Sequence, residues 1–145
     1  MNRIPVFVPA YLAFFTALLS LLGSLYFSEI MKLAPCALCW YQRIVMYPLV
    51  IIFFVGIMRK DKYLYQYALP LGIVGFFIAL YHNLLYLGYI PEALQPCVNG
   101  ISCTAKQLEL FGFITIPLMS LMAFATIIIC MTLYRKTHLS PEHAE

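Results

Sequence analysis

The chain has 145 residues, of which 63% are hydrophobic and 10% are charged, whereas an ordinary soluble domain is about 45–50% apolar and about 25% charged. Nine Lys and Arg and six Asp and Glu residues are too few to cover a folded chain of this length, so the composition excludes an ordinary water-soluble domain. The formal net charge of +3 is too small and too scattered to indicate a nucleic-acid-binding protein.

Four charge-poor segments are long enough to cross a membrane as helices. Each approaches, with its flanks, the roughly 20 residues that a helix needs to span about 30 Å of hydrocarbon. None shows the strict alternation of apolar and polar residues that is typical of a barrel strand. We therefore predict an all-α integral membrane four-helix bundle in a single domain, residues 1–145, with transmembrane helices at about 9–28, 40–58, 65–87 and 110–134.

The first of these segments follows Arg3, which is one feature of a signal peptide. Its apolar run exceeds the roughly 7–15 residues of a signal-peptide core, and no clear A-x-A cleavage site follows, so we expect a retained helix. Pro48, Pro70 and Pro117 fall inside the predicted helices. Membrane helices tolerate proline where neighbours satisfy the freed carbonyl, and we expect kinks there rather than gating elements.

The cations near the ends of the segments predict the orientation of the helices. Six share one side and three are left for the other; the first group is Arg3, Arg59, Lys60, Lys62, Arg135 and Lys136, and the second is Lys32, Arg43 and Lys106. Under the positive-inside rule, both termini and the turn at 59–63 are expected in the cytoplasm. The loops at 29–39 and 88–109 then face outward.

Four of the five cysteines lie on the predicted outward side, Cys36 and Cys39 where the first loop meets the second helix, and Cys97 and Cys103 in the second loop. Disulfides form and persist in such a compartment. Cys130 lies about 20 residues along the last helix from its outer end, which is roughly 30 Å from the other four. We interpret it as a small buried hydrophobe.

The segment 35–43, PCALCWYQR, holds a C-x-x-C pair at the start of a predicted helix. Free N–H groups and the positive end of the helix dipole stabilise a thiolate there, and thiolates exchange disulfides. Trp40 stands where c-type haem attachment requires histidine. Arg43 falls on the same helix face as both cysteines, where it either reaches the lipid headgroups or holds the negative charge of a thiolate or a bound ligand.

His82 is the only ionisable side chain of the third segment apart from tyrosines. It lies about five residues from the outer end of the helix, which is roughly 7 Å below that end and comparable to the depth of Arg43. A histidine in a membrane helix indicates a functional site, and a hydrogen bond between helices is the alternative. Asn83 beside it is a candidate for a polar contact between helices.

Five residues separate Cys97 from Cys103, and so short a loop with a glycine closes easily as a disulfide. Such a bridge is either structural or redox-active. A disulfide across so short a loop stabilises almost no structure, so a redox-active bridge is favoured. A redox-active bridge needs a higher, more oxidising reduction potential than a structural disulfide has. A zinc site built from the four outward cysteines is the alternative. The oxidising compartment argues against it, as does the lack of basic or chelating side chains around the cysteines, and we predict no metal.

Together these features resemble the DsbB family of membrane thiol:quinone oxidoreductases, most closely its short Bacillus-type BdbC members. The resemblance covers the whole chain, from the CALCWYQR segment after the first span to the histidine late in the third and the cysteine pair in the second outer loop. It implies a multi-pass protein of the bacterial cell (inner) membrane with extracytoplasmic cysteine loops. In the Gram-negative members the second-loop cysteines lie much farther apart, with an amphipathic segment between them. Only five residues lie between Cys97 and Cys103, so an amphipathic helix between these two cysteines is ruled out.

The resemblance also implies a relay of two disulfides, Cys97–Cys103 and Cys36–Cys39. Cys97 and Cys103 would oxidise the dithiol of a soluble or membrane-anchored thioredoxin-like, DsbA-like thiol oxidase, with Cys97 forming the mixed disulfide. The electrons would then pass by exchange to Cys36 and Cys39.

A quinone is the implied acceptor of these electrons. Cys39 would face the quinone ring as a thiolate, and Arg43 and His82 match the quinone-site residues of the family. The Bacillus-type likeness favours menaquinone over ubiquinone.

The expected function is therefore enzymatic, with reoxidation of an extracytoplasmic thiol oxidase and reduction of a quinone, so that exported proteins acquire disulfides. The alternative is a non-catalytic helical membrane subunit whose outer disulfides brace loops for a partner. A disulfide reductase or isomerase would need a thiol relay on the inner side, where Cys130 is the only candidate and has no second cysteine.

Overall fold

The computed structural model describes residues 7–32, 35–89, 109–110 and 114–139. Within these ranges it contains four long helices, the first of which continues as a short π-helix. They are α1 (Val8–Leu25) with η1 (Tyr26–Ile30), α2 (Ala37–Met58), α3 (Leu64–Tyr86) and α4 (Ile116–Leu139). Two short strands, β1 (Glu109–Leu110) and β2 (Ile114–Thr115), pair antiparallel before α4, with Glu109 opposite Thr115 and Leu110 opposite Ile114.

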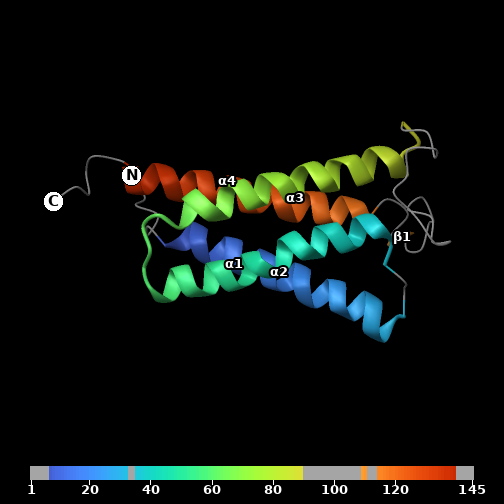
Figure 1. Cartoon of the computed structure of the whole chain (residues 1–145), viewed down its shortest axis with the longest axis horizontal. Coiled ribbons are helices and arrows are strands. Elements are labelled where there is room, and N and C mark those ends of the chain that lie inside the picture. Colours follow the sequence, from blue (N-terminus) through green and yellow to red (C-terminus); the bar gives the residue numbers. More distant parts are fainter. Residues whose placement is uncertain (1–6, 33–34, 90–108, 111–113, 140–145) are drawn as a thin grey trace.

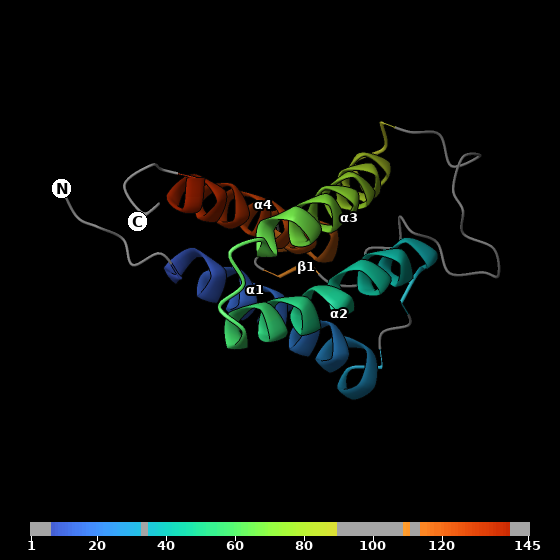
Figure 2. The ribbon, with the colours of Figure 1, turned by 60° about the vertical axis from the view of Figure 1, so that its left-hand side comes forward.

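The helices form an up-and-down bundle in which each packs against the next and α4 closes the ring against α1 (Figure 1). The beginning of α1, the α2–α3 turn and the end of α4 lie at one end of the bundle. The beginning of α2, the end of α3 and the beginning of α4 lie at the other, and the rotated view in Figure 2 shows the same arrangement.

Each of the four helices has the length and composition of a membrane span. Their apolar windows have mean hydropathies between 1.7 and 2.2 over spans of 22 or 23 residues. A helix of that length rises about 33 Å, which is enough to cross the roughly 30 Å hydrocarbon core of a bilayer. The prediction of four helices able to span a membrane is therefore confirmed within the described residues.

The fourth helix lies farther along the chain than the predicted 110–134. It begins at Ile116, directly after β2, and runs to Leu139. Pro117 is therefore in the first turn of the helix, where an N–H group has no intrahelical partner to lose. The kink expected at Pro117 is wrong for this reason, whereas Pro48 and Pro70 do lie inside α2 and α3.

The cationic residues of the α2–α3 turn and of the end of α4 lie at the same end of the bundle (Figure 1). The hydroxyl of Tyr134 in α4 donates a hydrogen bond to the backbone carbonyl of Asp61 in that turn over 2.9 Å, which links the two segments. Lys136 lies in the last turn of α4, where a cation interacts favourably with the helix dipole. The helix therefore continues past the charges at which the predicted span stopped. Arg3 lies outside the described residues.

Small residues bring the helices of the bundle close together. Ala10, Ala13 and Ala17 of α1 are fully buried, and their spacing puts them on one helix face. On α3, a Cβ atom at Gly75 would run into the ring of Phe124 of α4. Close approach at small residues is how membrane helices gain packing contacts, because lipid provides no hydrophobic force between them.

Large apolar side chains are exposed on the outer surface of the bundle. Leu19, Ile51 and Phe77 expose 68%, 65% and 62% of their surface. Water-soluble monomers rarely expose contiguous apolar patches of large size. The exterior of the described bundle is therefore suited to hydrocarbon and not to water.

Candidate active site

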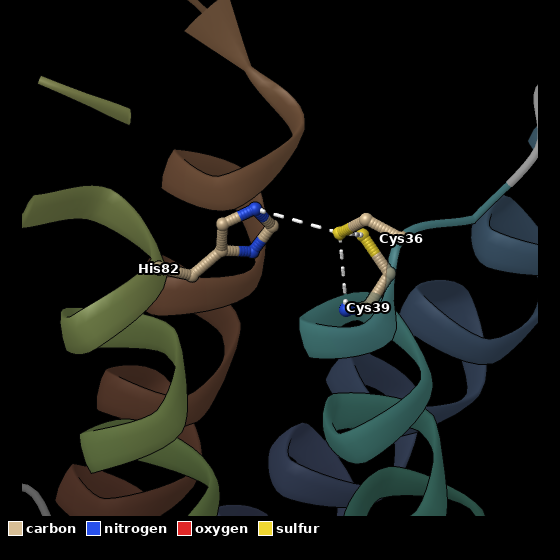
Figure 3. Close-up of side chains that lie close together, drawn as sticks. All are labelled: Cys36, Cys39 and His82. Carbon is tan, nitrogen blue, oxygen red and sulfur yellow. Dashed lines mark hydrogen bonds between the residues drawn. The ribbon is translucent and has the colours of Figure 1, made fainter. Parts of the chain in front are cut away.

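Cys36 and Cys39 lie at the N-terminus of α2, where the sequence predicts the C-x-x-C pair. Cys36 is the N-cap residue, and its sulfur accepts a hydrogen bond from the backbone N–H of Cys39 over 3.4 Å. The first N–H groups of a helix have no intrahelical acceptor, so a sulfur at the N-cap satisfies one of them. This cap holds the Cys36 sulfur beside the first turn of α2, on the side that faces α3 (Figure 3).

The two sulfur atoms form a hydrogen-bonded thiol pair. They lie 3.0 Å apart and both cysteines are free, whereas a disulfide bond is roughly 2.05 Å long. The hydrogen bond from the Cys39 thiol lowers the pKa of Cys36 most, burial raises it, and the His82 ring lowers it further, so that the pKa falls to about 4. Cys36 is therefore the thiolate of the reduced pair at neutral pH, and Cys39 carries the proton between them.

This assignment differs from the thiolate on Cys39 that the family resemblance implies. The difference concerns the state of the pair, because the contacts described here belong to the fully reduced dithiol. A thiolate on Cys39 stays a prediction for the step in which Cys36 is bonded to another sulfur.

His82 of α3 approaches the pair from the neighbouring helix. Its side chain is 2% exposed, and its Nε2 atom lies 3.8 Å from the sulfur of Cys36 (Figure 3). On the other side of the ring, the amide nitrogen of Gln42 donates a hydrogen bond to Nδ1 over 3.1 Å. With Nδ1 as the acceptor of the neutral ring, the proton sits on Nε2 and faces the Cys36 sulfur.

Arg43 of α2 forms hydrogen bonds with Ser24 of α1. Its Nε donates to the hydroxyl of Ser24 over 2.8 Å, and a terminal nitrogen donates to the backbone carbonyl of the same residue over 2.9 Å. The guanidinium carbon also lies 5.6 Å from the centre of the Trp40 ring, a cation–π distance. Among the described residues, the hydrogen bonds of Arg43 thus run to Ser24 and not to either cysteine.

A cavity of about 270 Å³ lies between α1, α2 and α4, next to the C-x-x-C pair. Most of its wall is apolar, and Cys39 and Arg43 are part of that wall. The lining residues are Leu19, Ser20, Leu21, Gly23, Ser24, Phe27, Pro35, Cys39, Gln42, Arg43, Met46, Tyr47, Ile116, Met119, Ser120 and Phe124.

The two residues that the sequence assigns to one quinone site lie on different sides of Cys39. Arg43 lines the cavity, whereas His82 contacts Cys36 and, among the described residues, does not line the cavity. Cys39 belongs to both groups, because its sulfur contacts Cys36 and its residue forms part of the cavity wall.

Two polar residues of the site, Gln42 and Ser24, are not predicted from the sequence. Gln42 lies next to Arg43 in the CALCWYQR segment, and this position is the only sign in the sequence that it belongs to the site. Its side chain is uncharged, so it does not stand out among the residues of the predicted span. Ser24 is one of several serines in the first span, and nothing in the sequence pairs it with Arg43 on another helix.

Asn83 beside the site and Cys130 in the bundle core have the structural roles that the sequence predicts. The amide nitrogen of Asn83 donates to the carbonyls of Ala79 in its own helix and of Pro117 in α4, over 2.8 and 2.7 Å, so it connects α3 to α4. Cys130 is a buried member of the bundle core. Cys97 and Cys103 lie outside the described residues, and their disulfide stays a prediction.

Comparison with known proteins assigns the chain to a family. The sequence model described as disulfide bond formation protein DsbB matches residues 8–134. The chain belongs to the DsbB family. It is 47% identical over 134 residues to disulfide bond formation protein C of Bacillus subtilis, covering 92% of this chain and 95% of the relative.

Other relatives agree with this assignment. The chain is 45% identical over 119 residues to the probable disulfide formation protein C of Halalkalibacterium halodurans (81% of this chain, 86% of the relative). It is 41% identical over 126 residues to a probable disulfide formation protein of Metapseudomonas resinovorans (86% and 88%). No solved structure gives a significant match.

Members of the DsbB family are membrane disulfide oxidoreductases and are associated with quinone cofactors. Membership supports a role for this chain in disulfide formation. A thiolate is the attacking species in thiol–disulfide exchange, and a second thiol in contact with it can complete a disulfide. The arrangement at the end of α2 is therefore suited to the chemistry of the family.

Proposed function

We propose that this DsbB-family protein is a thiol:quinone oxidoreductase that reoxidises a thioredoxin-like, DsbA-like thiol oxidase outside the cytoplasm. Electrons enter at the Cys97–Cys103 disulfide, pass to Cys36–Cys39 and leave to a membrane quinone, menaquinone rather than ubiquinone. Exported proteins acquire disulfides as a result. The observation that carries the proposal is the position of Cys39, in contact with the Cys36 thiolate on one side and with the cavity on the other.

The cavity suits a quinone ring in size and chemistry. An apolar cavity of about 150 Å³ holds benzene, so one of about 270 Å³ has room for a larger ring. A guanidinium has five N–H donors, and the two hydrogen bonds from Arg43 to Ser24 leave others for a carbonyl oxygen. The residues present therefore fit the group that the family uses.

The redox step at the C-x-x-C pair balances in a simple way. A bound quinone supplies an acceptor for two electrons and two protons. The Cys36–Cys39 disulfide forms as the two sulfurs give up two electrons. Because Cys36 is already a thiolate, the pair itself releases one proton, from the sulfur of Cys39, and the second proton is drawn from solvent.

The transfer between the two cysteine pairs is an exchange that conserves disulfides. The dithiol of the partner becomes a disulfide as Cys97–Cys103 is reduced, with Cys97 forming the mixed disulfide. Cys97–Cys103 then re-forms as Cys36–Cys39 is reduced. The end of α3 and the beginning of α4 lie at the end of the bundle where α2 begins (Figure 1), and Cys97 and Cys103 fall between these two helices in the sequence, which supports this encounter.

The distribution of charge supports an orientation in the bacterial cell membrane. The described cations of the α2–α3 turn and of the end of α4 lie at the end of the bundle opposite the C-x-x-C pair (Figure 1). Under the positive-inside rule that end is cytoplasmic. The pair at the start of α2 then faces the oxidising, extracytoplasmic side, where disulfides persist.

The test is to mix purified protein with a reduced thioredoxin-like oxidase and a menaquinone analogue, and to follow the quinone absorbance. Wild-type protein is expected to consume quinone, and serine variants of Cys36, Cys39, Cys97 or Cys103 are not. Full turnover by Cys39→Ser would contradict the mechanism.

A second pair of variants tests the cavity. Ser120→Phe fills the cavity from α4 and is expected to lower kcat/KM for quinone more than tenfold. Thr126→Phe makes a similar change in size on the same helix, at a residue outside the lining, and is expected to keep wild-type kcat/KM. Equal values for the two variants would show that the quinone binds elsewhere.

A further inference from the structure

Cys36, Cys39 and His82 bring three potential metal ligands together at the end of the bundle (Figure 3). The two Sγ atoms and the nearer imidazole nitrogen all lie within 4.8 Å of one another. Cys36 and His82 are buried and Cys39 is half-buried, so the group is held by packing. Two thiolates and an imidazole are the donors that zinc and similar thiophilic divalent cations prefer.

We propose that the reduced C-x-x-C pair and His82 form a binding site for Zn²⁺ or a chemically similar divalent cation, and that the oxidised pair does not. From the sequence we predict no metal, after weighing a site built from the four outward cysteines, and the proposal departs from that prediction. The group found here replaces two of those cysteines with His82 from α3. The inference does not depend on the quinone reaction.

The distances are close to those of a tetrahedral site. With Zn–S bonds of about 2.3 Å and a Zn–N bond of about 2.0–2.1 Å, two sulfurs lie about 3.8 Å apart, and a sulfur and a nitrogen about 3.6 Å apart. The distance from Cys36 Sγ to His82 Nε2 is 3.8 Å and already fits. The two sulfurs, 3.0 Å apart, have to separate by under about 1 Å, which a small rotation of one side chain provides.

Gln42 supplies the outer contact that a metal-binding histidine normally has. Such a histidine binds through one ring nitrogen and donates a hydrogen bond from the other. When Nε2 of His82 binds a cation, its proton has to sit on Nδ1, which faces Gln42. A side-chain amide has both a donor and an acceptor, so Gln42 satisfies Nδ1 in either state by rotating its amide.

Cation binding at this site changes bonds and protons but transfers no electrons. Two S–Zn bonds and one N–Zn bond form, Cys39 releases its thiol proton, and His82 stays neutral by moving its proton to Nδ1. Three protein ligands leave a fourth position for water. Sulfurs held about 3.8 Å apart by a metal do not form a disulfide, so the cation reversibly blocks the reduced pair.

The test uses the full-length protein in detergent with Cys97, Cys103 and Cys130 changed to serine, which leaves Cys36 and Cys39 as the only thiols. Zn²⁺ affinity is measured by competition with a chromophoric chelator, for the pair reduced with a phosphine and for the pair oxidised to the disulfide. Co²⁺ is used in parallel, because thiolate ligation gives it a charge-transfer absorption band.

The reduced protein is expected to bind one Zn²⁺ per chain, at least tenfold more tightly than the oxidised protein, and to give the thiolate band with Co²⁺. Equal affinities in the two states would overturn the proposal. This comparison needs no substitution at the site, so it stands even if a site variant fails to fold.

The role of the histidine is tested with a matched pair on α3. His82→Ala removes a ligand and is expected to weaken Zn²⁺ binding more than tenfold, since loss of an outer-shell contact alone costs about 10–100-fold. Leu84→Ala, at a partly exposed residue of the same helix, is expected to bind as the parent does. The same Zn²⁺ affinity for both variants would mean that only the two thiolates bind the cation, and it would overturn the assignment of His82 as a ligand.

Discussion

Gln42 of α2 donates a hydrogen bond to Nδ1 of His82 in α3, and this contact decides which nitrogen of the ring carries the proton. The proton on Nε2 faces the sulfur of Cys36, 3.8 Å away. A neutral amide therefore contributes to the acidity of a thiol that it does not touch.

Gln42→Leu removes this contact with little change in size. The ring then no longer has a fixed tautomer, and the stabilisation that it gives to the Cys36 thiolate weakens. A hydrogen bond to a charged group contributes about 1.5–3 kcal/mol, so a partial loss is expected to raise the pKa of Cys36 by about one. The measurement is the pH dependence of iodoacetamide alkylation, with EDTA present, in protein whose other thiols apart from Cys39 are replaced by serine.

Tyr41→Phe is the matched control, because Tyr41 is exposed and adjacent to Gln42 on the same helix. Its alkylation midpoint is expected to match that of the parent. A midpoint unchanged by Gln42→Leu would mean that the amide only fills space.

The low pKa of Cys36 predicts an unusual pH dependence of the reduction potential. Its pKa is about 4 in the reduced protein, against about 8.5 for an ordinary thiol. Between these values, reduction of the disulfide takes up two electrons but only one proton, which goes to Cys39. The potential is therefore expected to fall by about 30 mV per pH unit as pH rises, and not by the roughly 59 mV of a reduction that takes up two protons.

Redox equilibration with dithiothreitol between pH 5 and pH 8, in protein lacking Cys97 and Cys103, measures this slope. His82→Ala is expected to move the onset of the shallow region to higher pH, because the thiolate loses one of the contacts that stabilise it. A slope of about 59 mV per pH unit throughout would show that both sulfurs are protonated in the reduced pair.

Ser24 is expected to control the affinity of the quinone site through Arg43. Ser24→Ala removes the hydroxyl that accepts from Nε and leaves the guanidinium less well fixed in the cavity wall. The apparent KM for quinone is expected to rise about three- to tenfold, since a hydrogen bond to a charged group is involved, with kcat nearly unchanged. Thr16→Ala is the control, because the Thr16 hydroxyl bonds within its own helix; equal KM values for both variants would leave Ser24 without this role.

Two glycines of α3 are expected to respond in opposite ways to the same substitution. A Cβ atom at Gly75 runs into the ring of Phe124, whereas one at Gly72 finds its nearest neighbours at 3.5 and 3.6 Å. Gly75→Ala is expected to destabilise the bundle by about 1–3 kcal/mol through overpacking. Gly72→Ala is expected to be neutral or mildly stabilising, since alanine favours the helix. Thermal unfolding in detergent compares them, and equal midpoints would mean that the α3–α4 contact adapts freely.

The bundle could be predicted from the sequence because lipid leaves few options for a chain with so few charges. Hydropathy does not fix where a helix begins if the residues before it are apolar too, as Leu110 and Ile114 are. The start of α4, and with it the place of Pro117 in the first turn, therefore cannot be predicted from hydropathy. The predicted span ends before Arg135 and Lys136, but cations are favourable in the last turn of a helix. The helix α4 therefore continues past them to Leu139.

The position of the C-x-x-C pair at a helix start can be predicted from the sequence, because residue spacing and the helix dipole act within one element. The partners of the site residues on other helices cannot be predicted in this way. The contacts of Arg43 with Ser24 and of Gln42 with His82 depend on how α1, α2 and α3 pack. That packing depends on small residues such as Ala13, and their spacing in the sequence does not indicate which helix they contact.

Asn83 holds α3 to the first turn of α4 through the carbonyl of Pro117. In the proposed relay, Cys97 and Cys103 are carried on the chain between these two residues. Two cysteine pairs on one chain meet at an effective concentration on the order of millimolar. The proposed transfer between the pairs is therefore expected to follow first-order kinetics, so that diluting the protein slows its encounter with the proposed partner and leaves the internal step unchanged.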